Sequence, residues 1–402
     1  MIPVGSPAIG DDFFDRGDEI SQIISTLDKD SVILIAPRRF GKTSVMIGLE
    51  KELLNRGKTS VFLEVEDVYS PRRFLSEIVV ALVENERIRR KTKLVHALRE
   101  GTKWIKENIK ENIEEIGISE FKVKLRSNIE EDLKKDWVER SRQIFEIIGK
   151  ENSEICVIID EFPVAIKNMS KIDQNETEKF LHWFRKLRQL TRNLKFIAGG
   201  SVSIDRVVRD VGGISTINDF KRIRIGGFQR EVALSVIEKV FKGEGWEYKT
   251  VLGEKILDCI GEAYIPYFIA VMLSAIKEER ILRGNEINGD LIEAVYNFRI
   301  LGNEGKYYFE YYFQRLRIFY TGMEEKASKA ILRKVCSQDY YPVELAFGVF
   351  YKETGEDDYE KFMDLIADLG NDFYIEHDTK RGLKFYSKML RDWWRIYYGD
   401  IE

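Results

Sequence analysis

The stretch that decides the fold is residues 31–44, SVILIAPRRFGKTS. Its first part, 31–36, is an apolar run rich in β-branched residues, which is typical of a buried parallel strand. The eight residues from Ala36 to Thr43 match the phosphate-binding pattern GxxxxGK[ST], except that alanine replaces the first glycine. A helical segment, TSVMIGLEKELLNR, follows. Strand, loop and helix in this order are the context that the pattern requires.

This loop has a direct physical use. When it wraps a polyphosphate, its backbone N–H groups point inward and the following helix adds the positive end of its dipole. Lys42 would place an ammonium between the β- and γ-phosphates, and Thr43 would offer a hydroxyl to Mg²⁺. The alternative is a lysine-bearing turn without a ligand. We predict that the nucleotide-binding residues are Ala36, Pro37, Arg38, Arg39, Phe40, Gly41, Lys42, Thr43 and Ser44, with Lys42 also catalytic.

A second chemical signal is the segment 155–161, ICVIIDE. A buried apolar strand that ends in two adjacent carboxylates is costly unless those carboxylates have partners. At the carboxyl end of a parallel strand they reach the ligand crevice. We predict that Asp160 holds Mg²⁺ and that Glu161 acts as the general base on the attacking water. Their alternative role is to cap the next segment.

Two further groups of residues are candidates near this site. The strand-like run 194–199 leads into Gly199-Gly200-Ser201, where Ser201 could contact the γ-phosphate or the attacking water; a tight turn is the alternative. An arginine finger would stabilise the transition-state charge, in cis or from a neighbouring subunit. Each candidate arginine has a solvated surface position as its alternative. The candidate arginines are Arg185, Arg188, Arg206 and Arg209.

Strand-like and helix-like segments alternate through the first part of the chain, which predicts an α/β domain with a parallel sheet over residues 1–227. A long polar insertion at about 87–128 is predicted as a solvated helix, with a partner-binding arm as the alternative. The predicted strands are 31–36, 60–66, 155–159, 194–199 and 221–226, and the predicted helices are 43–56, 71–86, 129–149 and 174–191.

The strand signal stops after residue 227. Residues 230–320 are predicted to be mostly helical, with breaks near Gly243–Gly245, Pro266 and Gly302–Gly305. The segment 305–320, GKYYFEYYFQRLRIFY, is dense in aromatic residues. At helical spacing these residues are predicted to bury against neighbouring helices; base stacking would need them exposed.

The pattern changes again from residue 323. Two strand-like runs, FYIEHD and LKFYSK, flank a turn signal at 379–382. Three helices followed by a hairpin is the order of a winged helix. The three predicted helices are 324–337, 342–353 and 358–369.

Composition excludes several classes of protein. The 402 residues are 44% hydrophobic and 33% charged, which excludes a disordered chain. The net charge of −4 does not favour a strong nucleic-acid binder. Three scattered cysteines and three scattered histidines give neither a disulfide framework nor metal-ligand spacing. Without a signal-peptide pattern or a long apolar run, a cytoplasmic protein that does not enter the membrane is expected.

These segments together resemble the archaeal-type ATPase family in the AAA+/STAND branch of P-loop NTPases. The residues that carry the resemblance are APRRFGKTS at 36–44, ICVIIDEFP at 155–163 and FFDRGDEISQI at 13–23. In such ATPases the opening segment lies by the adenine, which implies a nucleotide contact for Phe14 and Arg16. Gly199-Gly200-Ser201 matches the sensor position, which gives Ser201 a catalytic role.

Two C-terminal segments extend the resemblance. Residues 264–268, YIPYF, resemble the G-x-P motif of the family's lid and bring Pro266 to the nucleotide, although no glycine stands two residues before the proline. Residues 385–394, FYSKMLRDWW, resemble the end of its winged helix. The resemblance implies an ATP-binding core, a helical lid at 228–322 and a winged helix at 323–402. It also implies adenine rather than guanine, and no N/TKxD-type guanine-reading motif is present.

Three functions compete. The first is an ATP-hydrolysing AAA+/STAND-type switch, slow without a partner or oligomer, whose lid and winged helix move with nucleotide state. The second is an initiator-like ATPase that binds DNA through the winged helix. The third is a non-enzymatic nucleotide-binding scaffold, against which the intact pair Asp160-Glu161 argues, because a binder needs no general base.

Charge separates the first two functions. Residues 323–402 contain 12 basic and 17 acidic residues, a net charge of −5. Duplex binding relies on neutralising phosphates with cations, so we rank docking on the ATPase core or on a protein partner above DNA binding. Glu376, Asp378 and Asp392 dilute the one basic cluster. That cluster consists of Lys380, Arg381, Lys384, Lys388, Arg391 and Arg395.

Overall fold

The computed structural model describes residues 6–10, 13–14, 16–36, 39–91, 118–150, 154–200, 203–284, 286–320 and 322–399. The chain forms two compact units. The sheet unit comprises Arg16–Arg38 and Lys42–Ile225, and the helical unit comprises Met1–Asp15, Arg39–Gly41 and Gly226–Glu402. Three residues of the phosphate-binding loop therefore pack with the helical unit. The predicted boundaries at 227 and 322 stay predictions.

The sheet unit is built on five parallel strands in the order β2-β3-β4-β1-β5. All five strands lie where the sequence predicted them, and the predicted α/β fold class is confirmed. Because β4 pairs with both β1 and β3, the ends of these three strands are neighbours at one sheet edge. The strands are β1 (Val32–Ile35), β2 (Thr59–Glu64), β3 (Ile155–Asp160), β4 (Leu194–Gly200) and β5 (Lys221–Arg224).

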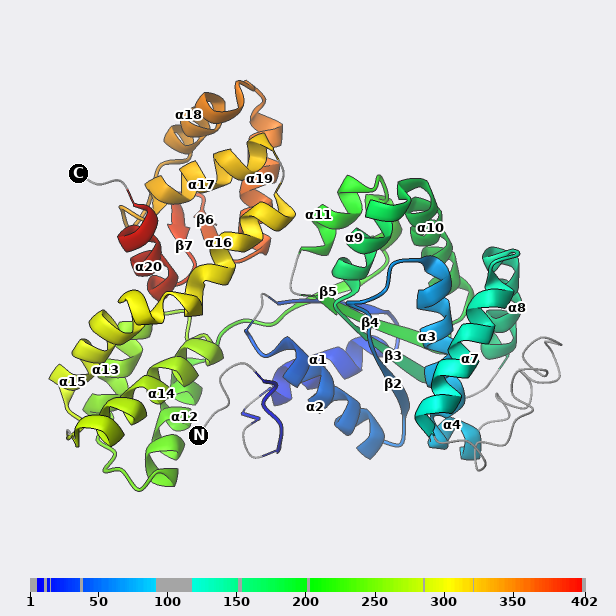
Figure 1. Ribbon diagram of the computed structural model, residues 1–402, viewed down its shortest axis with the longest axis horizontal. Coiled ribbons are helices and arrows are strands. Elements are labelled where there is room, and N and C mark those ends of the chain that lie inside the picture. The colour runs from blue at the N-terminus through cyan, green and yellow to red at the C-terminus, as the bar shows by residue number, and fades with distance from the viewer. Residues whose placement is uncertain are drawn as a thin grey trace. The chain divides into compact units, whose positions relative to one another are not determined.

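Helices cover both faces of this sheet. Figure 1 shows α1 (Gly17–Leu27) and α2 (Lys42–Asn55) on one face, and α3 (Pro71–Glu84), α9 (Phe162–Ile172) and α10 (Gln174–Leu190) on the other. Buried aromatic side chains of α3, α9, α10 and β4 fill the second interface. Their rings contact one another at centroid distances of 4.9–5.9 Å. The contacting residues are Phe74, Phe162, Phe180, Phe184 and Phe196.

One predicted helix of this unit needs correction, and several further helices were not predicted. The helix predicted at 129–149 is two helices, α7 (Ile118–Leu133) and α8 (Trp137–Gly149), because the Asp136 carboxylate accepts the Glu139 N–H at 3.1 Å and starts a new helix. Helix α9 was not predicted at all. The structure also contains α4 (Glu86–Lys91), α11 (Ile204–Asp210) and the 3₁₀ turn η2 (Ile214–Ile217).

The polar insertion is only partly solvated. Residues 92–117 lie outside the described part of the chain. Beyond them, α7 buries one stripe formed by Leu125, Ile129 and Leu133. The Arg126 guanidinium on α7 donates to the carboxylate of Glu77 on α3 at 2.9 Å. Apolar residues four apart share one helix face, so this stripe is buried. The stretch 98–117, on which the prediction of a solvated helix depends, lies outside the described residues, and that prediction stays a prediction.

The helical unit begins with a bundle whose breaks fall where the sequence predicted them. Helix α12 ends at Gly243, α14 begins at Pro266, and a short 3₁₀ turn holds Asn303–Gly305. The elements are α12 (Arg230–Gly243), α13 (Thr250–Ile260), α14 (Pro266–Arg283), α15 (Gly289–Ala294), the π-helix η3 (Val295–Ile300), η4 (Asn303–Gly305) and α16 (Tyr307–Phe319).

Three helices and an antiparallel hairpin follow in the predicted order, and a final helix closes the chain. The hairpin turn is held by the Asp378 carboxylate, which accepts the N–H groups of Lys380 and Arg381 at 2.8 and 3.0 Å. The assignment of this part as a winged helix stays a prediction. Its elements are α17 (Met323–Val335), α18 (Val343–Thr354), α19 (Tyr359–Asn371), β6 (Ile375–Asp378), β7 (Gly382–Phe385) and α20 (Lys388–Tyr398).

A buried ion pair ties α16 to the residues after α19. The Arg315 side chain is 1% exposed, and its guanidinium lies 3.5 Å from the Asp372 carboxylate. The Tyr320 hydroxyl also donates to Asp372, at 3.0 Å. The Tyr374 hydroxyl donates back to the carbonyl of Tyr312 on α16 at 2.7 Å.

Candidate functional site

The residues of the two chemical signals meet at the carboxyl edge of the sheet. Lys42 and Thr43 open α2, while Asp160 ends β3 and Glu161 follows it. The Lys42 ammonium pairs with the carboxylate of Asp160 and, at 3.2 Å, with that of Glu161. The Thr43 hydroxyl donates to Asp160 Oδ2 at 2.7 Å. We call these four residues the carboxylate–lysine cluster.

Burial makes this cluster electrostatically strong. Lys42 is 5% exposed and Asp160 4% exposed, so neither charge is well screened by water. Two carboxylates against one ammonium leave a net negative charge that suits a divalent cation. The hydroxyl of Thr43 and the carboxylate of Asp160 are the hard oxygen donors that Mg²⁺ prefers. The residues present therefore fit the predicted metal.

The backbone of Glu161 is unusual. Its φ of 57° lies in the left-handed region, which non-glycine residues rarely adopt. The Asp160 carboxylate accepts the Glu161 N–H at 2.8 Å. Glu161 is the N-cap residue of α9, but its side chain makes no capping hydrogen bond. That carboxylate instead accepts a hydrogen bond from the Lys42 ammonium at 3.2 Å.

Two glycines in β4 make room for the cluster. Gly199 and Gly200 are the last two residues of the strand. Ser201 lies outside the described residues, so its contact with the γ-phosphate and the tight turn both stay open. A Cβ at Gly199 would lie 3.2 Å from Lys42 Cδ and 2.4 Å from Met46 Cε. A Cβ at Gly200 would lie 2.3 Å from Pro163 Cδ and 3.5 Å from Glu161 Oε2. The missing side chains let Lys42 cross β4 toward the carboxylates on β3.

We predict that Gly200→Ala damages the site more than Gly199→Ala. The flexible end of Met46 can yield to a new methyl group, whereas the ring of Pro163 at the start of α9 cannot. Overpacking of this kind costs about 1–3 kcal/mol, and here it would also displace Glu161. Denaturant unfolding and ATP turnover of both variants test this, and equal losses in the two variants would contradict it.

Other predicted site residues are placed separately. Ala36 follows β1, and Ser44 is buried in α2. Phe14 belongs to the helical unit, where the Lys239 ammonium lies 4.6 Å from its ring centroid, and Pro266 opens α14 in the same unit. The buried Arg16 donates to Glu19 at 2.6 Å. Pro37, Arg38 and Ser201 lie outside the described residues.

The candidate arginine fingers are mostly not at the surface. Arg188 is buried; its guanidinium donates to Asp219 at 2.8 and 3.0 Å and lies 4.1 Å from the ring centroid of Phe220. Arg206 is also buried and Arg185 is half-buried. The surface alternative is wrong for Arg188 and Arg206, since α10 and α11 turn these side chains inward. Of the four candidates, Arg209 alone is exposed.

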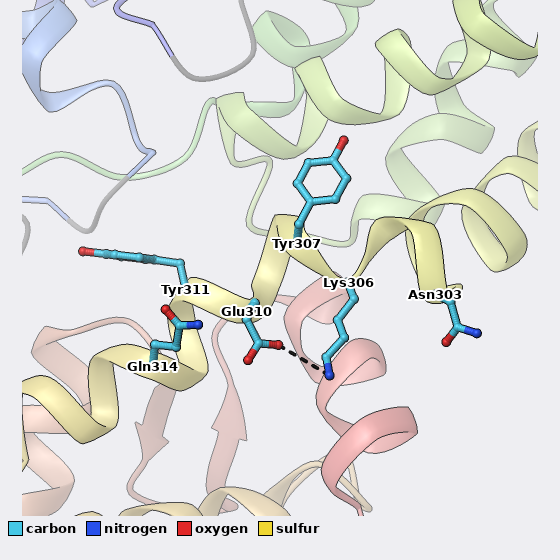
Figure 2. Close-up of a pocket in the computed structure, with 6 residues that line it drawn as sticks. All are labelled: Asn303, Lys306, Tyr307, Glu310, Tyr311 and Gln314. Carbon is cyan, nitrogen blue, oxygen red and sulfur yellow. Dashed lines mark ion pairs between the residues drawn. The ribbon is translucent and has the colours of Figure 1, made fainter.

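A pocket of about 570 Å³ lies along α16. Its lining residues belong to the helical unit, whereas the carboxylate–lysine cluster belongs to the sheet unit. Figure 2 shows Tyr307 and Tyr311 pointing out of the helix, and the ion pair between Lys306 and Glu310, 3.7 Å long, on the side of the helix away from Tyr307. The expected burial of the α16 aromatics holds for several residues and is wrong for Tyr307, which is 64% exposed. The lining residues are Asn303, Lys306, Tyr307, Glu310, Tyr311 and Gln314.

The three cysteines lie in described parts of the chain, are buried and form no disulfide. Burial raises the pKa of the Cys156 thiol to about 11, so this residue behaves as a small buried hydrophobe. Across the described ranges, no helix is long and apolar enough to cross a membrane. Nor do these ranges hold a group of three or more histidine, cysteine, aspartate or glutamate side chains able to bind a metal ion.

The fold of this chain is similar to that of solved structures. No protein-family model and no curated protein matches the chain. The Walker-type ATPase Paby2304 of Pyrococcus abyssi matches with a TM-score of 0.65 at 15% identity, covering 98% of this chain and 99% of that one. The Aeropyrum pernix ORC2 protein, in ADPNP–ADP complexes, matches with a TM-score of 0.49 at 11% identity over 96% of both chains. The chain therefore has the fold of a Walker-type ATPase over nearly its whole length.

Proposed function

We propose that this protein binds ATP with Mg²⁺ and hydrolyses it, and that its nucleotide state controls the position of the lid (228–322) and of the winged helix (323–402) as in an AAA+/STAND-type switch. The observation that carries the proposal is the carboxylate–lysine cluster. A buried lysine, a hydroxyl and two carboxylates at the carboxyl edge of a parallel sheet are the parts that phosphoryl transfer requires.

Each residue of the cluster has a distinct task in this mechanism. Thr43 and Asp160 would hold Mg²⁺, which when bound neutralises charge on the phosphates. Lys42 would leave its carboxylate partners and bind the β- and γ-phosphate oxygens. Glu161 would accept a proton from the attacking water as the new bond to the γ-phosphorus forms. The bond to the bridging oxygen breaks, and ADP and inorganic phosphate result.

ATP turnover by the protein alone should be slow. Within the described ranges, none of the four candidate arginines belongs to the carboxylate–lysine cluster, and an arginine finger is worth about 10³–10⁵ in rate. We therefore propose that a protein partner or oligomer formation accelerates turnover. We further propose a cytoplasmic location, and adenine contacts from Phe14, Arg16 and Pro266. Ser201 is proposed to contact the γ-phosphate or the water.

ATP turnover by the purified protein tests the proposal. Inorganic phosphate release should require Mg²⁺, stop on addition of a chelator, and increase when cell extract is added. Binding of ATP without any turnover under all these conditions would favour the nucleotide-binding scaffold instead. If the protein does not bind ATP, both the ATPase function and the scaffold function are wrong.

The alternative is an initiator-like ATPase that uses the winged helix on DNA. Some residues of its basic cluster pair with acidic neighbours: Lys384 with Glu376 at 2.9 Å, and Lys388 with Asp392 at 2.7 Å. Arg391 likewise contacts an aspartate at 2.9 Å. Paired cations release fewer counterions from DNA than free ones, so their contribution to duplex binding is small.

We predict weak and salt-sensitive DNA binding at most. Residues 323–402 carry a net negative charge, and these ion pairs already engage several of their cations, so little positive charge is left to bind DNA phosphates. Gel shifts at about 150 mM salt with duplexes of varied sequence measure this, since specific sites bind at about 10⁻⁸–10⁻¹¹ M. Nanomolar, sequence-specific binding would favour the initiator-like function.

A further inference from the structure

The tip of the phosphate-binding loop is held by the helical unit. Arg39–Gly41 belongs to that unit, although Lys42 belongs to the sheet unit. The Phe40 side chain is 1% exposed. Its ring lies 5.3 Å from the ring centroid of Phe373, which precedes β6, and 5.8 Å from that of Tyr386, which follows β7. We call Phe373 and Tyr386 the socket.

Arg39 makes a second contact of the same kind. Its guanidinium lies 3.9 Å from the ring centroid of Tyr267 on α14, within cation–π range. It also donates to the backbone carbonyl of Tyr308 on α16 at 3.0 Å. The two side chains at the loop tip therefore reach two different parts of the helical unit, the helical bundle and the hairpin.

The loop backbone is wound in a particular way. Arg39 has a φ of 75° and Gly41 a φ of 84°, so left-handed residues stand on both sides of Phe40. Alternating right- and left-handed residues form a nest, in which successive N–H groups converge on an anion. Glycine adopts this conformation freely, but arginine does so only where its surroundings hold it.

The socket also contains a left-handed residue. Phe373 has a φ of 60°, which is rare for a bulky side chain. Its ring packs edge-on against Tyr386 at a centroid distance of 4.9 Å. Non-glycine residues with left-handed backbones concentrate at switch regions and binding sites. In the described chain they are Arg39, Glu161, Tyr264 and Phe373.

We infer that Arg39 and Phe40 are positioning residues: their side chains, gripped by α14, α16 and the socket, keep the loop wound so that its N–H groups can bind phosphate. The inference rests on the proposed nucleotide site and adds the side-chain contacts that hold Arg39–Gly41 of the loop in this conformation. Linkage is reciprocal. If the socket strengthens nucleotide binding, bound nucleotide must equally strengthen the grip of the socket on Phe40.

The test is a double-mutant cycle on nucleotide affinity. Phe40→Ala and Phe373→Ala should each weaken ADP binding, measured by calorimetry, by about tenfold, within the usual range of coupling between sites. The double variant should be no weaker than either single one, because both remove the same contact. Phe362→Ala is the matched control: this buried aromatic on α19 contacts Phe347 and Phe350 and does not belong to the socket. It should leave ADP affinity unchanged.

Hydrogen exchange gives a readout that a merely structural role would not move. ADP should protect the backbone amides of residues 373–386 in the wild type, and this protection should disappear in Phe40→Ala. Arg39→Gly removes the contacts to α14 and α16 while allowing a left-handed backbone, so it should also weaken binding. An unchanged or higher ADP affinity in Arg39→Gly would show that the grip does not support the loop.

The possible outcomes separate the two proposals. If the wild type binds no nucleotide, the proposed function fails. If it binds ADP and folded Phe373→Ala binds it equally well, this inference alone is overturned. Should an alanine variant unfold by circular dichroism, leucine at 40 and 373 keeps the apolar volume and completes the same cycle.

Discussion

Replacing Glu161 with glutamine is expected to leave ATP bound and to stop its hydrolysis. The amide is nearly isosteric, so Thr43 and Asp160 keep their contact, but it cannot accept a proton from water. General bases contribute about 10²–10⁴-fold, and turnover should fall by that order. Affinity for ATP should stay the same or rise, because a negative charge beside the γ-phosphate is removed. Single-turnover phosphate release and calorimetry measure the two effects.

Glu64→Gln is the matched control for this prediction. Glu64 ends β2, directly opposite Asp160 in the strand register, and its side chain is exposed. The same change of charge one strand away should leave turnover nearly unaltered. Wild-type turnover in Glu161→Gln would show that another residue activates the water.

Lys42→Ala is expected to abolish tight binding of ATP–Mg²⁺. The variant loses the cation that would lie between the β- and γ-phosphates, and it leaves two carboxylates side by side where the phosphates must enter. Calorimetry should show no measurable affinity at concentrations that saturate the wild type. An unchanged affinity would overturn the assignment of the phosphate-binding loop.

The same variant should also lower stability without nucleotide. Removing one partner of a buried ion pair costs about 3–5 kcal/mol, and the partial exposure of Glu161 places the expected loss at the lower end. Denaturant unfolding measures it. Lys51→Ala, at an exposed position of the same helix, is the control and should change the unfolding free energy little.

Strands were easier to predict than helices in this chain. A central parallel strand is apolar on both faces, so runs such as 155–159 stand out without any alternation. Helix α9 was not predicted for two reasons. A proline in a sequence usually indicates a break, although Pro163 lies at the helix start, where proline is well tolerated. Glu161, which precedes the helix, also has a left-handed backbone that the sequence does not indicate. The cap at Asp136 is a local signal that could have divided α7 from α8.

The site was predictable where it is local in sequence. The GKT and DE motifs identified Lys42, Thr43, Asp160 and Glu161, because a strand end and a helix start bring such residues to one sheet edge. The socket for Phe40 was not predictable. Phe373 and Tyr386 follow it by more than 300 residues in the sequence, and an aromatic residue in a helical or hairpin pattern gives no indication of which distant ring it will meet.

The buried ion pair between Arg315 and Asp372 determines which C-terminal fragments of the chain can fold. A fragment that starts at Met323, the first residue of α17, would contain the aspartate and lack the arginine, together with the Tyr320 hydroxyl. It would bury that carboxylate without the Arg315 guanidinium, or open its own interior to water. We therefore expect a recombinant C-terminal fragment to fold only when its first residue lies before Tyr307, so that the fragment contains α16 as well as the hairpin.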